Sequence, residues 1–83
     1  MTQLIIDRAK WGRGSYRRDG DPCCAIGHWI DSDQPEYSEL TRSLHDRITA
    51  ANDTLPNGPE REQRIADLFA EAGVEVVYEG VYT

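Results

Sequence analysis

Residues 8–18 hold the side chains best suited to recognise a negatively charged or aromatic ligand. This stretch contains five of the nine cationic residues of the chain. Arginine and lysine bind phosphates and carboxylates, while indole and phenol rings offer faces on which a base or a guanidinium group stacks. The candidate ligand- or partner-binding residues are Trp11, Arg13, Tyr16, Arg17 and Arg18. A purely structural role stays open, in which Trp11 belongs to the core and the arginines pair with acidic helices.

Two cysteines and two histidines form a second group of reactive side chains. Cys24 and His28 would lie one turn apart in a helix, a spacing that can chelate zinc, and Cys23 and His45 could approach them. Structural zinc sites usually combine paired C-x₂₋₄-C and H-x₃₋₅-H units, and neither pattern occurs here. A Cys–His nucleophile pair is normally oriented by a third residue, and none can be identified. We therefore expect two free thiols, no metal, no cofactor and no catalytic residue.

The charge of the chain is divided along its length. Residues 1–18 carry a net charge of +4 and residues 19–83 a net charge of −10, which gives −6 overall. Such asymmetry points to steering of a partner rather than to a particular fold. Because the acidic remainder would repel a long polyanion, a compact ligand or a protein partner fits better than direct binding of nucleic acid.

Carboxylates on two expected helices form a second candidate surface. Glu39 and Asp46 belong to the outer side of the middle helix, and Glu60, Asp67 and Glu71 to the outer side of the last one. Ordinary solvation of helix faces would explain them without any function. The sharper hypothesis is a contiguous negative surface that competes for a basic groove on a partner, as nucleic acid would.

Strands are expected near both ends of the chain. In the run QLIIDR, Leu4 and Ile6 share one face and Ile5 lies on the other. The run VEVVYE at 74–79 alternates between apolar and acidic residues, which is typical of a half-buried strand. The glycine-rich run GRGSYRRDGD predicts a loop or hairpin, with a short strand at 15–18.

Three helical segments are expected between these strands. The run CCAIGHWI favours a short buried helix over 22–30. A middle helix is expected from a D-x-x-E cap at Asp33 to about Ala51. The last helix starts near Pro59, carries an apolar stripe with helical spacing and stops before Gly73.

These elements predict a single α+β domain over residues 1–83. Its small antiparallel sheet is formed by the N- and C-terminal strands and packs against two main helices and a short cysteine-containing helix. A chain of this size buries only about 60–65% of the surface of its unfolded form, so one modest core is available and binding is favoured over catalysis. No apolar run approaches the roughly 20 residues that a membrane span requires, so a cytoplasmic location without a membrane partner is expected.

Four pieces of the chain resemble a family of small proteins encoded by bacteriophages and prophages. They are LIIDRAKWGRG, CCAIG, the dipeptide ND at 52–53, and EREQRIADLFAEAGVEVVYE at 60–79, in that order along the chain. The chain departs from the pattern by being short between the cysteines and the middle helix. The resemblance implies a phage accessory protein in a bacterial cytoplasm, and by analogy an anti-defence inhibitor of the anti-CRISPR kind.

The function expected from the sequence is therefore binding without catalysis. The protein would occlude a host protein, such as a nucleic-acid-binding defence component, with its acidic surface. The alternative is a small-ligand binder that captures a nucleotide or a nucleotide signal through the basic aromatic segment. The sequence does not indicate an oligomeric state.

Overall fold

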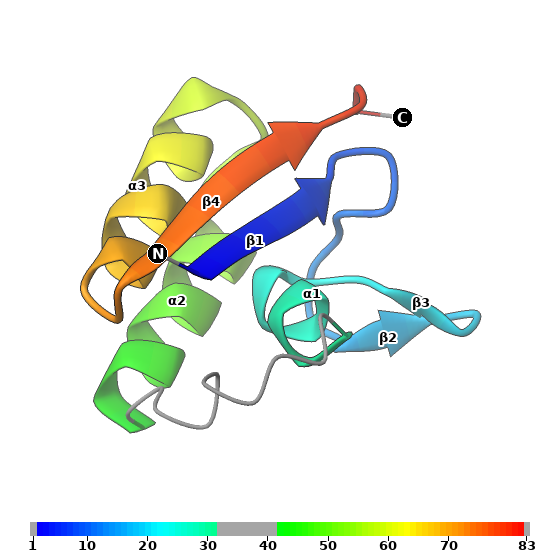
Figure 1. Cartoon of the computed structure of the whole chain (residues 1–83). Helices are drawn as coiled ribbons and strands as arrows, with labels where there is room; N and C mark the ends of the chain where they lie inside the picture. Colours follow the sequence, from blue (N-terminus) through cyan, green and yellow to red (C-terminus); the bar gives the residue numbers. More distant parts are fainter. Residues whose placement is uncertain (1, 32–41, 83) are drawn as a thin grey trace.

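The first and last strands form the main sheet of the structure. The computed structural model describes residues 2–31 and 42–82. β1 (Thr2–Asp7) pairs with β4 (Val74–Glu79) along the whole length of both strands. Figure 1 shows the two strands side by side, although they lie far apart in the sequence. The expected pairing of the first and last strands is confirmed.

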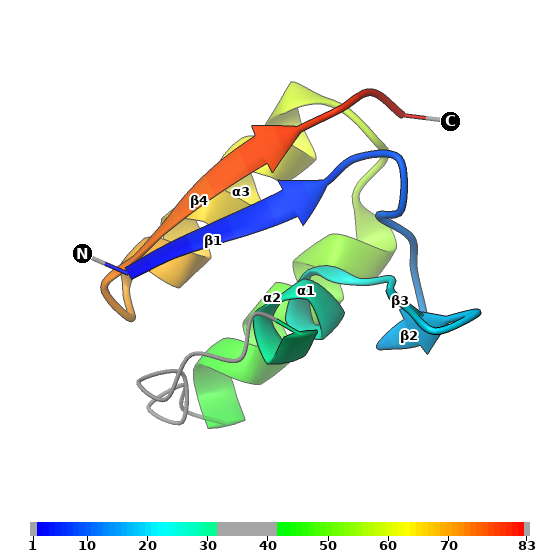
Figure 2. The same cartoon turned by 45° about the vertical axis from the view of Figure 1, so that its right-hand side comes forward.

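The two strands run parallel, which corrects the predicted antiparallel sheet. Parallel neighbours require a crossover connection of about a dozen residues or more, usually through a helix. Here the last helix of that connection, α3 (Pro59–Ala70), fixes the direction of β4. A turn at 71–73 reverses the chain, so that β4 runs back along α3 (Figure 2). The sheet direction therefore follows from helix packing, which the strand sequences themselves do not encode.

Three described helices build one side of the molecule. α3 packs against β4, and α2 (Arg42–Thr54) packs against α3. α1 (Ala25–Asp31) lies between β1 and α2. Within the described residues, the opposite face of the sheet is not covered by a helix (Figure 2). None of the helices in the described ranges is long and apolar enough to cross a membrane.

The core gathers the apolar faces that the sequence patterns predict. Leu4 and Ile6 of β1 are fully buried, whereas Ile5 between them is about half exposed. The apolar stripe of α3 is also fully buried; it consists of Ile65, Leu68 and Phe69. Trp29 of α1 stacks on Phe69, with ring centroids 5.2 Å apart. This stacking joins the short helix to the last one.

A small hairpin follows β1 and stands out from the helices (Figure 1). β2 (Arg17–Arg18) and β3 (Asp21–Pro22) pair antiparallel across the turn residues Asp19 and Gly20. Both turn residues have positive φ, 53° and 84°, as in a type I′ turn. Asp-Gly is a favoured sequence for such turns because glycine adopts positive φ without steric cost and aspartate tolerates it. Of the loop or hairpin predicted for GRGSYRRDGD, the structure forms a hairpin, but its first strand covers only Arg17–Arg18 rather than 15–18.

The helix boundaries agree with the sequence for α3 and differ for α1. α3 begins at Pro59, and Gly73 after it has the expected positive φ of 76°. α1 begins at Ala25 rather than at the expected residue 22, because Pro22 belongs to β3. Both cysteines therefore precede the helix. The expected cap of the middle helix at Asp33 lies outside the described residues. The described part of α2 continues past its expected end, to Thr54.

Candidate functional site

The basic aromatic segment is divided between the interior and the surface. Trp11 is only 6% exposed. Tyr16 is 51% exposed, and Arg17 and Arg18 are exposed on the hairpin. Arg13 is partly buried. The five residues that the sequence singles out therefore do not form one surface.

Trp11 is fixed by a buried asparagine. Its Nε1 donates a hydrogen bond to Asn52 Oδ1 at 2.6 Å, and the backbone N–H of Ala25 donates to the same oxygen at 3.0 Å. The amide nitrogen of Asn52 donates to the carbonyl of Gly12 at 3.1 Å and to Asp53 Oδ1 at 2.9 Å. Asn52 has no exposed surface, so these bonds satisfy groups that water cannot reach. One side chain thus joins the N-terminal loop, α1 and α2.

The ring of Trp11 is already occupied by side chains of its own chain. The guanidinium carbon of Arg61 lies 3.6 Å from its centroid, a cation–π contact. Tyr78 and Tyr82 stack against the indole with centroid distances of 5.2 and 6.1 Å. Arg61 is fully buried and donates to the carbonyl of Asn52 at 3.3 Å, and this burial lowers its pKa. Trp11 is therefore a core residue rather than a stacking platform for a ligand.

The cations closest to Trp11 in the sequence also have partners within the chain. Arg8 forms a bidentate ion pair with Glu62 of α3, with Nη2–Oε1 and Nε–Oε2 distances of 2.7 and 3.1 Å. The hydrogen bond from Arg8 lowers the pKa of Glu62. Lys10 lies 3.5 Å from the carboxylate of Asp21. Arg13 donates to a backbone carbonyl just after α2.

Two glycines allow the N-terminal loop to lie close to the cysteines and α1. A Cβ atom on Gly27 would lie 1.9 Å from the carbonyl oxygen of Tyr16, and one on Gly12 would lie 2.7 Å from the sulfur of Cys23. Real Cβ contacts are not that short, so a larger residue at either position would force a shift. The cost is greater at Gly27, because the close atom there belongs to the backbone. The glycines of the WGRG and CCAIG pieces therefore have a structural role.

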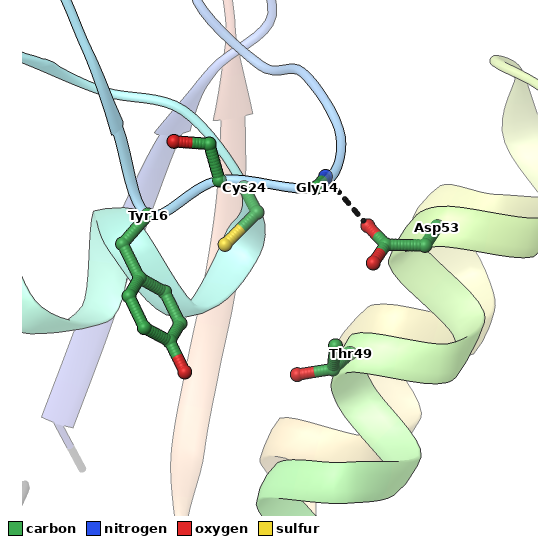
Figure 3. Close-up of a pocket in the computed structure, with 6 residues that line it drawn as sticks. Gly14, Tyr16, Cys24, Thr49 and Asp53 are labelled. Atoms are coloured by element: carbon green, nitrogen blue, oxygen red, sulfur yellow. Dashed lines mark hydrogen bonds between the residues drawn. The ribbon is translucent and has the colours of Figure 1, made fainter.

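A pocket of about 260 Å³ opens beside Tyr16. Its lining comes from the loop before the hairpin, the start of α1 and one face of α2; it consists of Gly14, Ser15, Tyr16, Cys24, Thr49 and Asp53. Figure 3 shows Tyr16 on one side, Thr49 and Asp53 on the other, and the Cys24 thiol between them. We name this the Tyr16 pocket.

Two acceptor side chains of α2 face the Tyr16 pocket. Asp53 Oδ1 accepts a hydrogen bond from the backbone N–H of Gly14 at 3.1 Å, which ties α2 to the loop (Figure 3). The hydroxyl of Thr49 is turned toward Tyr16. Its oxygen is buried and has no hydrogen-bond partner within the described ranges. The pocket therefore combines a carboxylate, a hydroxyl group and an aromatic ring.

The cysteines and histidines do not converge on one point. Cys23 and Cys24 are free thiols, as expected, and the structure buries both of them. Burial raises the pKa of Cys24, the opposite of what a thiolate nucleophile needs. His28 Nδ1 lies 2.9 Å from the carbonyl of Cys24, while His45 contacts the Tyr16 ring edge to face at 6.2 Å. Within residues 2–31 and 42–82, no group of three or more potential ligands is placed to hold a metal ion.

The predicted acidic residues of the helices lie at the surface wherever they are described. Asp46 of α2 and Glu60, Asp67 and Glu71 of α3 are all exposed. Glu39 lies outside the described residues. Their exposure agrees with the expected outer faces of the two helices.

This acidic surface also contains cations. Arg47 of α2 pairs with Glu71 of α3 at 2.9 Å, and Gln63 donates to Asp67 at 2.8 Å. Arg64 is exposed and lines a shallow hollow between α2 and α3 together with Arg47. The carboxylates best placed to meet a partner are therefore those outside the Arg47–Glu71 ion pair.

The sequence interpretation missed the buried polar residues that organise this region. Asn52 continues the spacing of Leu44 and Ile48, four residues after the latter, and so points inward with them. Arg61 precedes Ile65 by four residues and lies on the buried side of α3 in the same way. A polar residue with the same helical spacing as the buried apolar residues thus indicates, from the sequence alone, a buried polar side chain.

Comparison of the chain with protein-family models, with curated proteins and with solved structures finds no match. The resemblance to bacteriophage proteins stays a prediction from the sequence.

Proposed function

We propose that the protein acts by binding, and that its partner is a protein with a basic surface. The observation that supports this most directly is the internal use of cations. Arg8, Lys10 and Arg47 form ion pairs, Arg61 is buried, and Arg13 donates to a backbone carbonyl. Of the positive N-terminal segment, Arg17 and Arg18 stay exposed on the hairpin, while Arg8 and Arg13 are engaged within the chain.

The carboxylates, by contrast, lie mainly at the surface. The exposed acidic residues in the described ranges are Asp19, Asp21, Asp46, Asp53, Glu60, Asp67, Glu71, Glu75 and Glu79. Residues 31–41 add four further acidic residues and no cation to the sequence. A surface with this excess of negative charge speeds association with a basic protein and opposes association with nucleic acid.

Together with the resemblance to phage proteins, these charges favour an inhibitor. In this proposal the acidic helices cover a groove of a host defence protein that nucleic acid would otherwise occupy, in the anti-CRISPR manner. Occlusion requires contact area and complementary charge but no bond chemistry. The proposed role is therefore non-enzymatic.

Capture of a nucleotide by the basic aromatic segment is less well supported. Tyr16, Arg17 and Arg18 are exposed, but the ring of Trp11 contacts Arg61 and the guanidinium group of Arg13 is engaged. Arg17 also donates to the carbonyl of Gly20 at 3.4 Å, so at least three of the five residues proposed for a nucleotide site already have partners within the chain. The geometry favours the protein partner.

Native mass spectrometry of the tagged protein, recovered from a bacterial lysate, tests this proposal. We expect a stoichiometric complex with a host protein, and we expect added salt to dissociate it because salt screens exposed charges. Recovery of the protein with the added mass of a nucleotide would contradict the proposal and support the alternative. A protein complex that resists high salt would contradict its electrostatic basis.

A further inference from the structure

We propose that the Tyr16 pocket receives an arginine side chain of the partner. The choice of a protein partner rests on the proposed function, whereas the choice of arginine rests on the lining of the pocket. Its volume of about 260 Å³ lies below the roughly 300–1,000 Å³ of sites for drug-sized ligands. A single side chain suits this size better than a nucleotide does.

The α2 side of the pocket offers acceptors for a guanidinium group. Asp53 uses Oδ1 to hold the backbone of Gly14 and the amide of Asn52. Within the described ranges, both hydrogen bonds to the Asp53 carboxylate go to Oδ1, and Oδ2 has no donor. The buried Thr49 hydroxyl also lacks a partner there. A guanidinium group carries five N–H donors in a planar fork, which matches a carboxylate and a nearby hydroxyl.

The Tyr16 side of the pocket offers an aromatic face. Its ring is 51% exposed although it touches His45. A guanidinium group stacks on such a ring through cation–π attraction, and burial between the ring and a carboxylate strengthens both contacts. The pocket thus places an acceptor and a ring on opposite sides of one cavity (Figure 3).

The arginines of the neighbouring loop do not fill this pocket. Arg13 donates to a backbone carbonyl after α2, and Arg17 donates to the carbonyl of Gly20 at 3.4 Å. The pocket lining contains no cationic side chain from the described part of the chain. A phosphate group would meet the carboxylate of Asp53, whereas a cation is attracted to it.

An NMR titration tests the site with a defined probe. The ¹⁵N-labelled protein is titrated with N-acetyl-arginine amide and, separately, with N-acetyl-citrulline amide, its uncharged isostere. We expect saturable shifts of the Gly14 and Thr49 amides with arginine, and about tenfold weaker binding of citrulline because its charge is absent. Equal binding of the two probes, or shifts confined to other residues, would overturn the proposal.

Variants of the pocket sharpen the test. Asp53→Asn keeps an oxygen for the Gly14 N–H but removes the charge, and we expect arginine binding to fall about tenfold. Asp46→Asn is the matched control, because it removes an exposed carboxylate of the same helix outside the pocket. If Asp53→Asn fails to fold, Tyr16→Leu replaces it and is expected to weaken binding through loss of the ring. Unchanged affinity in the folded pocket variant would overturn the proposal.

The outcomes separate this proposal from the proposed function. A captured host protein together with no binding of the arginine probe would overturn the pocket site alone. Arginine binding in the Tyr16 pocket together with no host protein in the complex would support the site and contradict the proposed function.

Discussion

At the residue scale, Asn52 holds the N-terminal loop to the helices. Replacing it by alanine leaves the indole N–H of Trp11, the N–H of Ala25 and the carbonyl of Gly12 without partners in a buried region. Unpaired buried polar groups cost about 1–3 kcal/mol each, so we expect Asn52→Ala to lower the free energy of unfolding by about 2–4 kcal/mol. Urea denaturation followed by tryptophan fluorescence measures this change.

The matched control is Asn57→Ala. Asn57 is exposed in the turn before α3, and we expect this substitution to change the free energy of unfolding by less than about 0.5 kcal/mol. Similar losses for the two variants would contradict the role assigned to Asn52.

At Gly27, helix propensity and steric contact predict opposite changes in stability for the same substitution. Helix propensity alone predicts that Gly27→Ala stabilises the helix by about 1 kcal/mol. The contact argument predicts destabilisation, because the new Cβ would lie 1.9 Å from the carbonyl oxygen of Tyr16. We expect the melting temperature to fall. A rise would show that the loop and α1 are not packed as described.

The burial of some individual residues could be predicted from the sequence, and that of others could not. The inward direction of Asn52 and Arg61 follows from the helical spacing of their apolar neighbours. The burial of Trp11 has no such signal, because it lies in a loop without periodicity and its partners come from α2, α3 and the C-terminal residues. The pocket around Tyr16 was unpredictable for the same reason.

At the scale of elements, the Arg8–Glu62 ion pair links the end of β1 to α3. The lowered pKa of Glu62 means that its stabilising contribution is present above the unfolded value of about 4.3 and is lost as the pH falls through the folded value. We expect the stability difference between the wild type and Glu62→Gln to be largest near neutral pH. It should shrink as the pH is lowered below about 4.3.

The control for this pH profile is Glu60→Gln, which removes an exposed carboxylate of the same helix turn. Urea denaturation at several pH values should give nearly parallel curves for this variant and the wild type. A stability difference for Glu62→Gln that does not change with pH would contradict the role of the ion pair.

The elements themselves were largely predictable, and their relative direction was not. Apolar periodicity and the Pro59 and Gly73 signals locate α3, and alternation locates both strands. The parallel direction of the sheet depends on the packing of α3 along β4. This long-range contact leaves no pattern in the sequence of either strand. α1 starts later than the expected residue 22, because the Asp19-Gly20 turn pairs Asp21 and Pro22 with the strand before it.

At the scale of the whole molecule, the charges displayed at the surface differ from those that the sequence suggests. The sequence carries a basic N-terminal segment before an acidic remainder. In the structure most of the cations next to Trp11 are paired or engaged, and the carboxylates of both long helices, except Glu62, lie at the surface. Charge counts alone could not show this, because they do not tell which charges meet inside the fold.

The most direct test of the proposed acidic binding surface is the affinity with which two charge-reversed variants bind a host protein captured from the lysate. Glu60→Lys/Asp67→Lys changes α3, and Glu75→Lys/Glu79→Lys changes exposed residues of β4. Both variants have the same net charge. At low salt we expect the α3 variant to bind at least about tenfold more weakly than the wild type, and the β4 variant to bind within about threefold of it. Equal affinity of the α3 variant and the wild type would contradict the proposal that the acidic helices bind the partner.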